Sequence, residues 1–242
     1  MSPKNTFNVA VTGNPPFMEY DFNTSQLVRD ALPDVIQRPE KKDIRILKYA
    51  RDTRDTYEDV RRVSKDIWGG QRTMFSRMPG LEEKEGHVDV DLILHLGMVA
   101  LGWRTDMFRF ETMARRDGYK LPGDDGQFVN SDYLQKLGLP TSLETSFDVE
   151  AGWRKVKEKF PDTPSCVSDD AGLYFCEFRL YSSLAEPLLT PSFREKSGRV
   201  VFEHLPQDHS TEGIALARDI TVTFVAGLVD ARLAKEDEMS TV

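Results

Sequence analysis

Short apolar runs alternate along the chain with segments whose apolar positions recur at helical spacing. The apolar runs predict strands at residues 7–12, 44–47, 88–96, 165–168 and 200–205. The periodic segments predict helices at residues 25–32, 56–78 with an interruption at Gly69-Gly70, 152–160, 171–185 and 211–233. Strands that alternate with helices in this way are typical of an α/β protein, here a three-layer α/β/α sandwich with a central mixed, mostly parallel sheet.

Other segments depart from this alternation. Residues 116–150 lack periodicity and are rich in Gly, Asp, Pro and Ser, which indicates a long functional excursion. Residues 79–86 form a charged, solvated loop, Gly97 is expected to end the strand before it, and the tail after Ala234 is expected to fray. No repeat or linker divides the chain, so residues 1–242 are predicted to form a single domain.

Composition narrows the classes of function. The chain has 32 Lys and Arg against 40 Asp and Glu, a net charge of −8, which argues against binding to nucleic acid or anionic lipid. No apolar run reaches the roughly 20 residues of a membrane span, and the first residues lack the apolar stretch of a signal peptide. Two cysteines, Cys166 and Cys176, are too few for a disulfide scaffold or a Cys-based zinc site. We therefore expect a cytoplasmic protein with reduced thiols.

Cys176 is the first candidate for chemistry. It lies where a predicted strand passes through a Gly-containing turn into a helix. Unpaired backbone N–H groups and the helix dipole at such a position favour the nucleophilic thiolate. A small hydrophobe packed between Phe175 and Phe178 is the alternative, and this segment alone leaves both interpretations open.

His204 ends an apolar strand just before Pro206, and functional groups gather at the carboxyl ends of strands in open α/β sheets. A histidine at the edge of the core, bonded to a backbone carbonyl, is the alternative. His95 also ends a strand, but its more apolar run favours a packed histidine. Glu111 is an acid that could orient an imidazole, although composition does not single it out among 40 acidic residues.

A turn after the first predicted strand adds a possible loop at the site. Gly13 permits a tight turn there and leaves backbone amides free. The chain contains neither GxGxxG nor GxxxxGKS, so a nucleotide site is poorly supported.

Taken together, these segments resemble pyroglutamyl peptidase I, a family of cysteine exopeptidases. The matching motifs follow one another in the family's order. They are Val11-Thr-Gly13-x-x-Pro16-Phe17, Asn23-x-Ser25, the apolar strand at 90–97, Glu111 with Arg115, Pro122 with Asp125 and Gly126, Ala171-Gly172-x-x-x-Cys176, and Phe202-Glu-His204-Leu-Pro206. The resemblance covers most of the chain except charged expansions at 61–86 and 131–152.

The resemblance implies a phosphorylase/hydrolase-like fold and a cysteine-type omega peptidase that removes an N-terminal pyroglutamyl residue from peptides. It implies Cys176 as nucleophile, His204 as base and then acid, and Glu111 as the group that orients His204. No metal or cofactor is implied. A mostly apolar pocket for the lactam ring is implied, with ordinary core packing as the alternative role of its aromatic residues. Its residues would be Phe17, Leu121, Tyr174 and Phe175, with backbone contacts from Met98 and with Asn14 at a position usually held by Phe.

Four positions depart from the family pattern. Asn14 replaces an aromatic residue, Met18 a glycine, Arg116 an asparagine, and Glu177 the Asn or Asp that usually follows the nucleophile. Glu177 places negative charge near the thiolate, which Arg115 or Arg116 could offset. These departures keep two alternatives open. One is a weak or inactive relative that binds a ligand or partner, and the other is a hydrolase of the same fold with shifted specificity. The oligomeric state is left undetermined.

Overall fold

The computed structural model describes residues 6–17, 19–51, 53–76, 86–100, 102 and 104–240. Its central sheet contains β1 (Phe7–Thr12), β2 (Val35–Ile36), β3 (Ile44–Lys48), β4 (Leu92–Met98), β5 (Phe108–Glu111), β8 (Ser165–Ser168) and β9 (Val200–Leu205). A separate two-stranded sheet contains β6 (Met113–Arg115) and β7 (Ser142–Glu144). The helices are α1 (Thr24–Ala31), α2 (Tyr57–Gly69), α3 (Ser131–Lys136), α4 (Val149–Lys159), α5 (Phe175–Leu189) and α6 (Thr211–Ser240).

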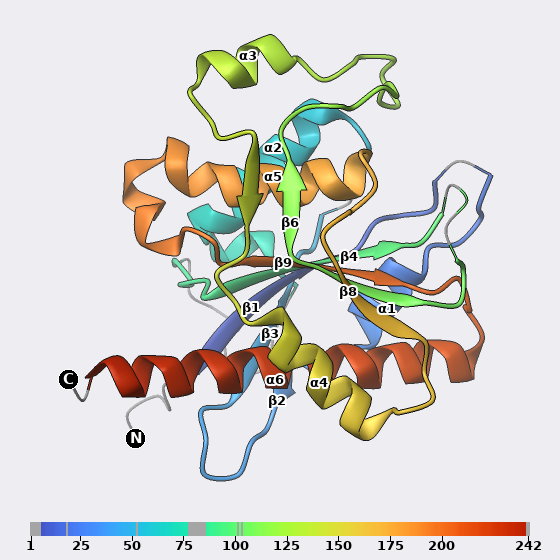
Figure 1. Cartoon of the computed structure of the whole chain (residues 1–242), viewed down its shortest axis with the longest axis vertical. Helices are drawn as coiled ribbons and strands as arrows, with labels where there is room; N and C mark the ends of the chain where they lie inside the picture. The colour runs from blue at the N-terminus through green and yellow to red at the C-terminus, as the bar shows by residue number, and fades with distance from the viewer. Residues whose placement is uncertain are drawn as a thin grey trace.

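The strands of the central sheet follow the order β2-β3-β1-β4-β9-β5-β8. Strands β3, β1, β4 and β9 run parallel, whereas β5 runs antiparallel to β9 and β8 runs parallel to β5. Helices cover both faces of the sheet, with α2 and α5 on one side and α1, α4 and α6 on the other (Figure 1). The predicted α/β/α architecture with a mixed, mostly parallel sheet is confirmed.

Side-chain alternation along the strands builds an apolar core on each face. In β9, Val200 and Phe202 join the core under α2 and α5, whereas Val201 and Leu205 join the core over α4 and α6. Because both faces are covered, all six residues of β9 are buried, Glu203 and His204 included. None of the helices that the structure describes is both long and apolar enough to cross a membrane.

Local capping explains where two helices begin. The Asn23 side chain accepts a hydrogen bond from the backbone N–H of Ser25 and starts α1. Thr56 does the same for α2 by accepting from the backbone N–H of Asp59. Gly70, in the left-handed conformation with φ 61°, ends α2 at the interruption predicted for Gly69-Gly70.

Other predicted boundaries were wrong in instructive ways. Gly97 does not end its strand, because β4 pairs with β9 as far as Met98. Helix α5 begins at Phe175 rather than residue 171, and α6 continues to Ser240 instead of fraying after Ala234. The excursion at 116–150 contains α3, β7 and the start of α4, and the sequence did not predict β2, β5 or β6. Most of the predicted loop at 79–86 lies outside the described residues.

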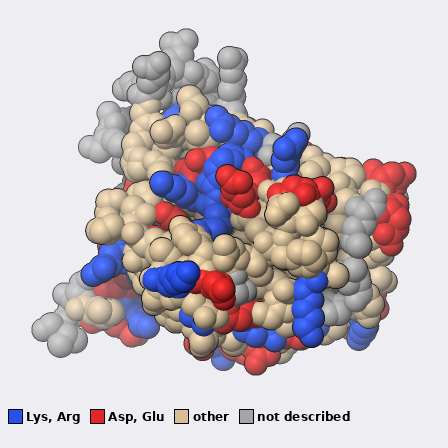
Figure 2. Space-filling model, turned by 90° about the horizontal axis from the view of Figure 1, so that it is seen from above, with Lys and Arg blue, Asp and Glu red and all other residues tan. Residues whose placement is uncertain are grey.

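Charged side chains of opposite sign lie next to one another on the surface. Figure 2 shows Lys and Arg beside Asp and Glu on the face seen from above. On α2, for example, Arg62 pairs with both Asp59 and Asp66. The expectation that the protein does not bind nucleic acid stays a prediction.

Candidate active site

The candidate catalytic side chains come from three elements that meet at one edge of the sheet. β9 carries His204 near its carboxyl end, the antiparallel neighbour β5 carries Glu111, and α5 carries Cys176 as its second residue. In the β5–β9 register, Glu111 stands opposite Phe202, two residues from His204 on the same face of the sheet. The sheet itself therefore brings the acid to the imidazole.

Glu111 and His204 form a buried hydrogen-bonded pair. Glu111 Oε1 lies 3.0 Å from His204 Nδ1, and the two side chains are 0% and 3% exposed. Arg109 Nε lies 3.4 Å from the same carboxylate oxygen. The contact fixes the ring so that Nε2 is turned away from Glu111, as a base that is oriented by an acid requires. The alternative for His204, a bond to a backbone carbonyl, does not account for this geometry.

Cys176 completes the group from the other side of His204. Its side chain is half-buried and lines a cavity together with His204. Burial lowers the pKa of His204, but the charge and hydrogen bond of Cys176, followed by those of Glu111, outweigh burial and raise this pKa to about 9. The imidazole thus favours its protonated form beside the sulfur. Because Cys176 lines the cavity, it does not fit the alternative of a small hydrophobe packed in the core.

The start of α5 supplies donors near the sulfur. The first backbone hydrogen bond of this helix runs from Phe178 N–H to Tyr174 O. The amides of the preceding residues, including Cys176, thus point out of the helix end, where they can meet negative charge. Gly97 of β4 lies directly below, because a Cβ built on it would stand 3.1 Å from Cys176 Sγ.

The cavity in front of Cys176 is small, about 90 Å³. It is lined by Asn14, Phe17, Asn23, Asp55, Met98, Ala100, Ala171, Gly172, Tyr174, Phe175, Cys176 and His204. The structure therefore gathers five of the six predicted substrate-binding residues around one space, and their role in binding stays a prediction.

Leu121, the sixth predicted residue, does not line this cavity. Its side chain is 43% exposed, and its backbone carbonyl accepts a hydrogen bond of 2.7 Å from the hydroxyl of Tyr57. That bond holds the loop outside the cavity. The sequence also missed Asp55, which no motif marks. Asn23 carried a usable signal, because it stands in the Asn23-x-Ser25 motif.

Two of the unusual residues have structural explanations. Glu177 is fully buried, and both of its carboxylate oxygens accept hydrogen bonds from the Arg115 side chain, at 2.6 and 2.8 Å. It also accepts from the backbone N–H of Leu173, which has a left-handed φ of 48°. Arg116 pairs with Asp117 and does not line the cavity. Of the two arginines that could offset Glu177, Arg115 is therefore the one that does; Met18 lies outside the described residues.

His95 is a packed histidine. It is completely buried, with Thr12 Oγ1 2.7 Å from Nδ1 and Ser183 Oγ 2.8 Å from Nε2. Burial, helped by the charge of Arg179, lowers the pKa of His95 well below its usual value. This histidine stays neutral and binds neighbouring hydroxyls.

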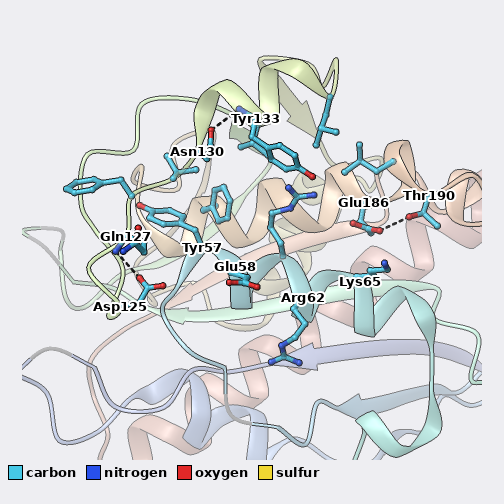
Figure 3. Close-up of a pocket in the computed structure, with 17 residues that line it drawn as sticks. Tyr57, Glu58, Arg62, Lys65, Asp125, Gln127, Asn130, Tyr133, Glu186 and Thr190 are labelled. Atoms are coloured by element: carbon cyan, nitrogen blue, oxygen red, sulfur yellow. Dashed lines mark hydrogen bonds between the residues drawn. The ribbon is translucent and has the colours of Figure 1, made fainter.

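A larger groove of about 740 Å³ lies between α2, α3 and α5 (Figure 3). Tyr133 projects into it from α3, and the guanidinium of Arg61 lies 5.4 Å from the centre of this ring. None of the three candidate catalytic residues lines this groove. This groove is larger than the cavity in front of Cys176, but the candidate catalytic side chains Cys176 and His204 line the smaller cavity.

Comparisons with known proteins bear on the family and the fold. No protein-family model matches the chain. Pyroglutamyl-peptidase 1 of Homo sapiens and that of Mus musculus are each 24% identical to it over 198 residues, 82% of this chain and 78% of either relative.

The fold matches solved structures over more of the chain. The pyrrolidone carboxyl peptidase of Fervidobacterium islandicum has a TM-score of 0.65 at 21% identity, and covers 93% of this chain and 99% of its own. Pyroglutamyl peptidase I of Bacillus amyloliquefaciens has a TM-score of 0.67 at 18% identity, with 92% and 96% covered. The chain is therefore similar in sequence to pyroglutamyl-peptidase 1 and in fold to pyrrolidone carboxyl peptidases, which confirms the resemblance that its motifs indicate.

Proposed function

We propose that this protein is a cysteine exopeptidase that removes an N-terminal pyroglutamyl residue from peptides. The observation that carries the proposal is that Cys176 and His204 line one small cavity while the buried Glu111 carboxylate lies 3.0 Å from His204 Nδ1. A nucleophile beside a base, which an acid orients in turn, is an arrangement that supports acyl transfer. The names of the sequence relatives supply the substrate class.

In the first half of the reaction, the Cys176 thiolate attacks the carbonyl carbon of the pyroglutamyl–peptide bond. The carbonyl electrons move to oxygen, and amides at the start of α5 stabilise the resulting oxyanion. When the intermediate collapses, the carbon–nitrogen bond breaks and the His204 imidazolium gives its proton to the leaving amine. The products are a shortened peptide and a pyroglutamyl thioester on Cys176.

In the second half, water attacks the thioester while neutral His204 accepts its proton. Collapse breaks the carbon–sulfur bond, releases pyroglutamate, and restores the thiolate beside the imidazolium. Glu111 holds Nδ1 throughout and stabilises the cationic ring whenever it forms. These steps need no metal or cofactor.

The test is hydrolysis of a pyroglutamyl coumarin amide by purified protein. Cys176→Ala and His204→Ala are expected to abolish turnover, whereas Cys166→Ala is the matched control because this second free thiol does not line the cavity. Iodoacetamide is expected to modify Cys176 and stop turnover together. Activity that survives in Cys176→Ala would overturn the mechanism, and its loss in Cys166→Ala would point to the other thiol.

We propose that the enzyme acts in the cytoplasm. Thiolate chemistry requires a reduced cysteine, which supports a cytoplasmic enzyme. The ion pair between Arg115 and Glu177 answers one of the reasons for considering an inactive relative, because the extra acid near Cys176 is neutralised. We also propose that the whole chain folds as a single domain.

A further inference from the structure

One wall of the small cavity carries a carboxylate that the proposed reaction does not use. Asp55 lies just before α2 and lines the cavity beside Asn14 and Tyr174. Its side chain is 12% exposed, and its Oδ1 atom is buried without a hydrogen-bond partner among the described residues. A buried polar atom without a partner is costly, so its presence calls for an explanation.

Arg179 lies behind this carboxylate. It stands on α5, close to one turn after Cys176, and it is completely buried. Its Nη2 lies 3.6 Å from Asp55 Oδ1, which is an ion pair but too long for a hydrogen bond. Within the described chain, none of its three side-chain nitrogens has a hydrogen-bond acceptor. Asp55 and Arg179 thus form a charge-balanced pair whose hydrogen-bonding capacity is unused.

Asn14 supplies the opposite kind of group to the same cavity. Its side-chain oxygen accepts a hydrogen bond of 2.9 Å from Thr53 Oγ1, and its backbone N–H donates to Ser25 Oγ at 3.0 Å. With its oxygen engaged, Asn14 can offer its amide nitrogen as a donor to a ligand. The cavity therefore combines an acceptor from Asp55 with a donor from Asn14.

We propose that Asp55 and Asn14 select the substrate's ring by hydrogen bonding. The Asp55 carboxylate accepts the N–H of the lactam, and the Asn14 amide donates to the ring carbonyl. A lactam fits this pair because its N–H and C=O are adjacent and both face one edge of the ring. It is also uncharged, as suits a carboxylate that Arg179 already balances. The inference rests on the proposed function and assigns the residues that determine its specificity.

The kinetic test compares two coumarin amides, one with the pyroglutamyl lactam and one with a γ-lactone in which oxygen replaces the ring N–H. The wild-type protein should prefer the lactam by ~10–100-fold in kcat/KM, because the lactone leaves Asp55 without its donor. In Asp55→Asn this preference should shrink, and in the double variant Asp55→Ala/Arg179→Met it should disappear. The double variant removes both charges together, so it leaves no unpaired buried ion.

A binding test separates this inference from the proposed function. Pyroglutamide and its lactone analogue are titrated calorimetrically into the Cys176→Ala protein, with and without the Asp55→Ala/Arg179→Met change. Lactam binding that depends on Asp55, together with no turnover by the protein that retains Cys176, would support the inference and overturn the function. Asp66→Asn is the matched control, since Asp66 pairs with Arg62 on α2 away from the cavity.

The outcomes that count against the inference are equally definite. Equal kcat/KM or Kd for lactam and lactone in the protein with Asp55 intact would overturn it. So would a lactam preference that survives in the double variant, or the absence of lactam binding to a folded Cys176→Ala protein. Turnover that depends on Cys176 but not on Asp55 would support the proposed function and contradict the role inferred for Asp55.

Discussion

At the residue scale, buried ionisable groups decide which parts of the site respond to pH. His204 is the clearest case, because Cys176 and Glu111 overcome burial and hold its pKa at about 9. A histidine whose pKa is raised on folding stabilises the protein fully below its unfolded pKa of 6.5, and this stabilisation is lost as pH rises through about 9. The loss of the His204 proton over the same pH range also removes the ability of His204 to protonate the leaving amine.

Glu111→Gln should lower the pH at which His204 loses its proton. The amide removes the negative charge that helps to keep the ring protonated, so the alkaline limb of kcat/KM should shift to lower pH and kcat should fall by ~10-fold or more. The measurement is the pH–rate profile on the pyroglutamyl coumarin amide, paired with an NMR titration of His204. Glu144→Gln, an exposed acid on β7, is the control. An unmoved histidine titration would contradict the role given to Glu111.

Glu203, next to His204 in β9, points to the opposite face of the sheet and has a different effect. It is completely buried, accepts a hydrogen bond of 3.1 Å from Thr221, and burial raises its pKa to about 8. Since its unfolded pKa is 4.5, the protonated acid stabilises the fold at low pH. That stabilisation is lost as pH rises from about 4.5 through about 8.

Glu203→Gln should therefore stabilise the protein by on the order of 3 kcal/mol at pH 8 and by little at pH 5. Urea unfolding of both proteins across this pH range measures the difference. The control is Glu195→Gln, because Glu195 is exposed. A difference in stability that is the same at pH 5 and pH 8 would show that Glu203 does not change its protonation there.

At the element scale, the β4–β9 pair matters because a glycine allows the nucleophile to approach the sheet. A Cβ on Gly97 would lie 2.6 Å from the ring of Phe202 and 3.1 Å from Cys176 Sγ. Glycine is therefore required here by close packing, and its φ is not in the left-handed region.

Gly97→Ala should reduce turnover and cost ~1–3 kcal/mol of unfolding free energy, because Phe202 and Cys176 must both shift. Gly69→Ala is the matched comparison, since no atom lies within 4 Å of the added methyl group and the residue is helical. It should stabilise by ~0.5–1 kcal/mol. Thermal unfolding and turnover measure both changes, and wild-type activity in Gly97→Ala would contradict the close approach.

The same elements explain how far the sequence could predict the structure. β1, β8 and β9 have the predicted bounds, because short runs that contain apolar residues and end at turn residues mark them locally. Gly97 was misread since its role depends on Phe202, which is distant in sequence. The charged end of α6 stays helical, with Arg232 paired to Glu236 one turn on. Two-residue β2 is too short for any pattern to show.

The candidate site could also be predicted from the sequence only in part. Motifs marked Cys176, His204 and Glu111, but only the sheet register brings the acid within 3.0 Å of the imidazole. No local pattern marks Asp55, because its contact with Arg179 joins segments far apart in the chain. Leu121 was misplaced because the bond from Tyr57 to its carbonyl has no local signature.

At the scale of the whole molecule, the two apolar cores share one set of strands. Trp68 on α2 belongs to one core, and Trp153 on α4 packs against the other. A protein that retains only one of these tryptophans reports on one face of the sheet. Since β1, β3, β4 and β9 contribute side chains to both cores, loss of either core removes support from the other.

Urea unfolding followed by Trp68 fluorescence and by Trp153 fluorescence should thus give coincident transitions. The comparison uses two variants, each with its other tryptophans replaced by Phe, and far-UV circular dichroism as a common reference. Midpoints that differ beyond the change seen by circular dichroism would divide the chain into separately folding parts and contradict the single-domain proposal.

The antiparallel placement of β5 has a consequence for how this scaffold can diversify. Glu111 and His204 meet through backbone pairing in the middle of the molecule, so neither depends on a surface segment for its position. Insertions around the rim can accumulate while the acid–imidazole couple keeps its spacing. Recognition of new end groups can then evolve by exchanging rim residues, with the proton-transfer apparatus inherited intact.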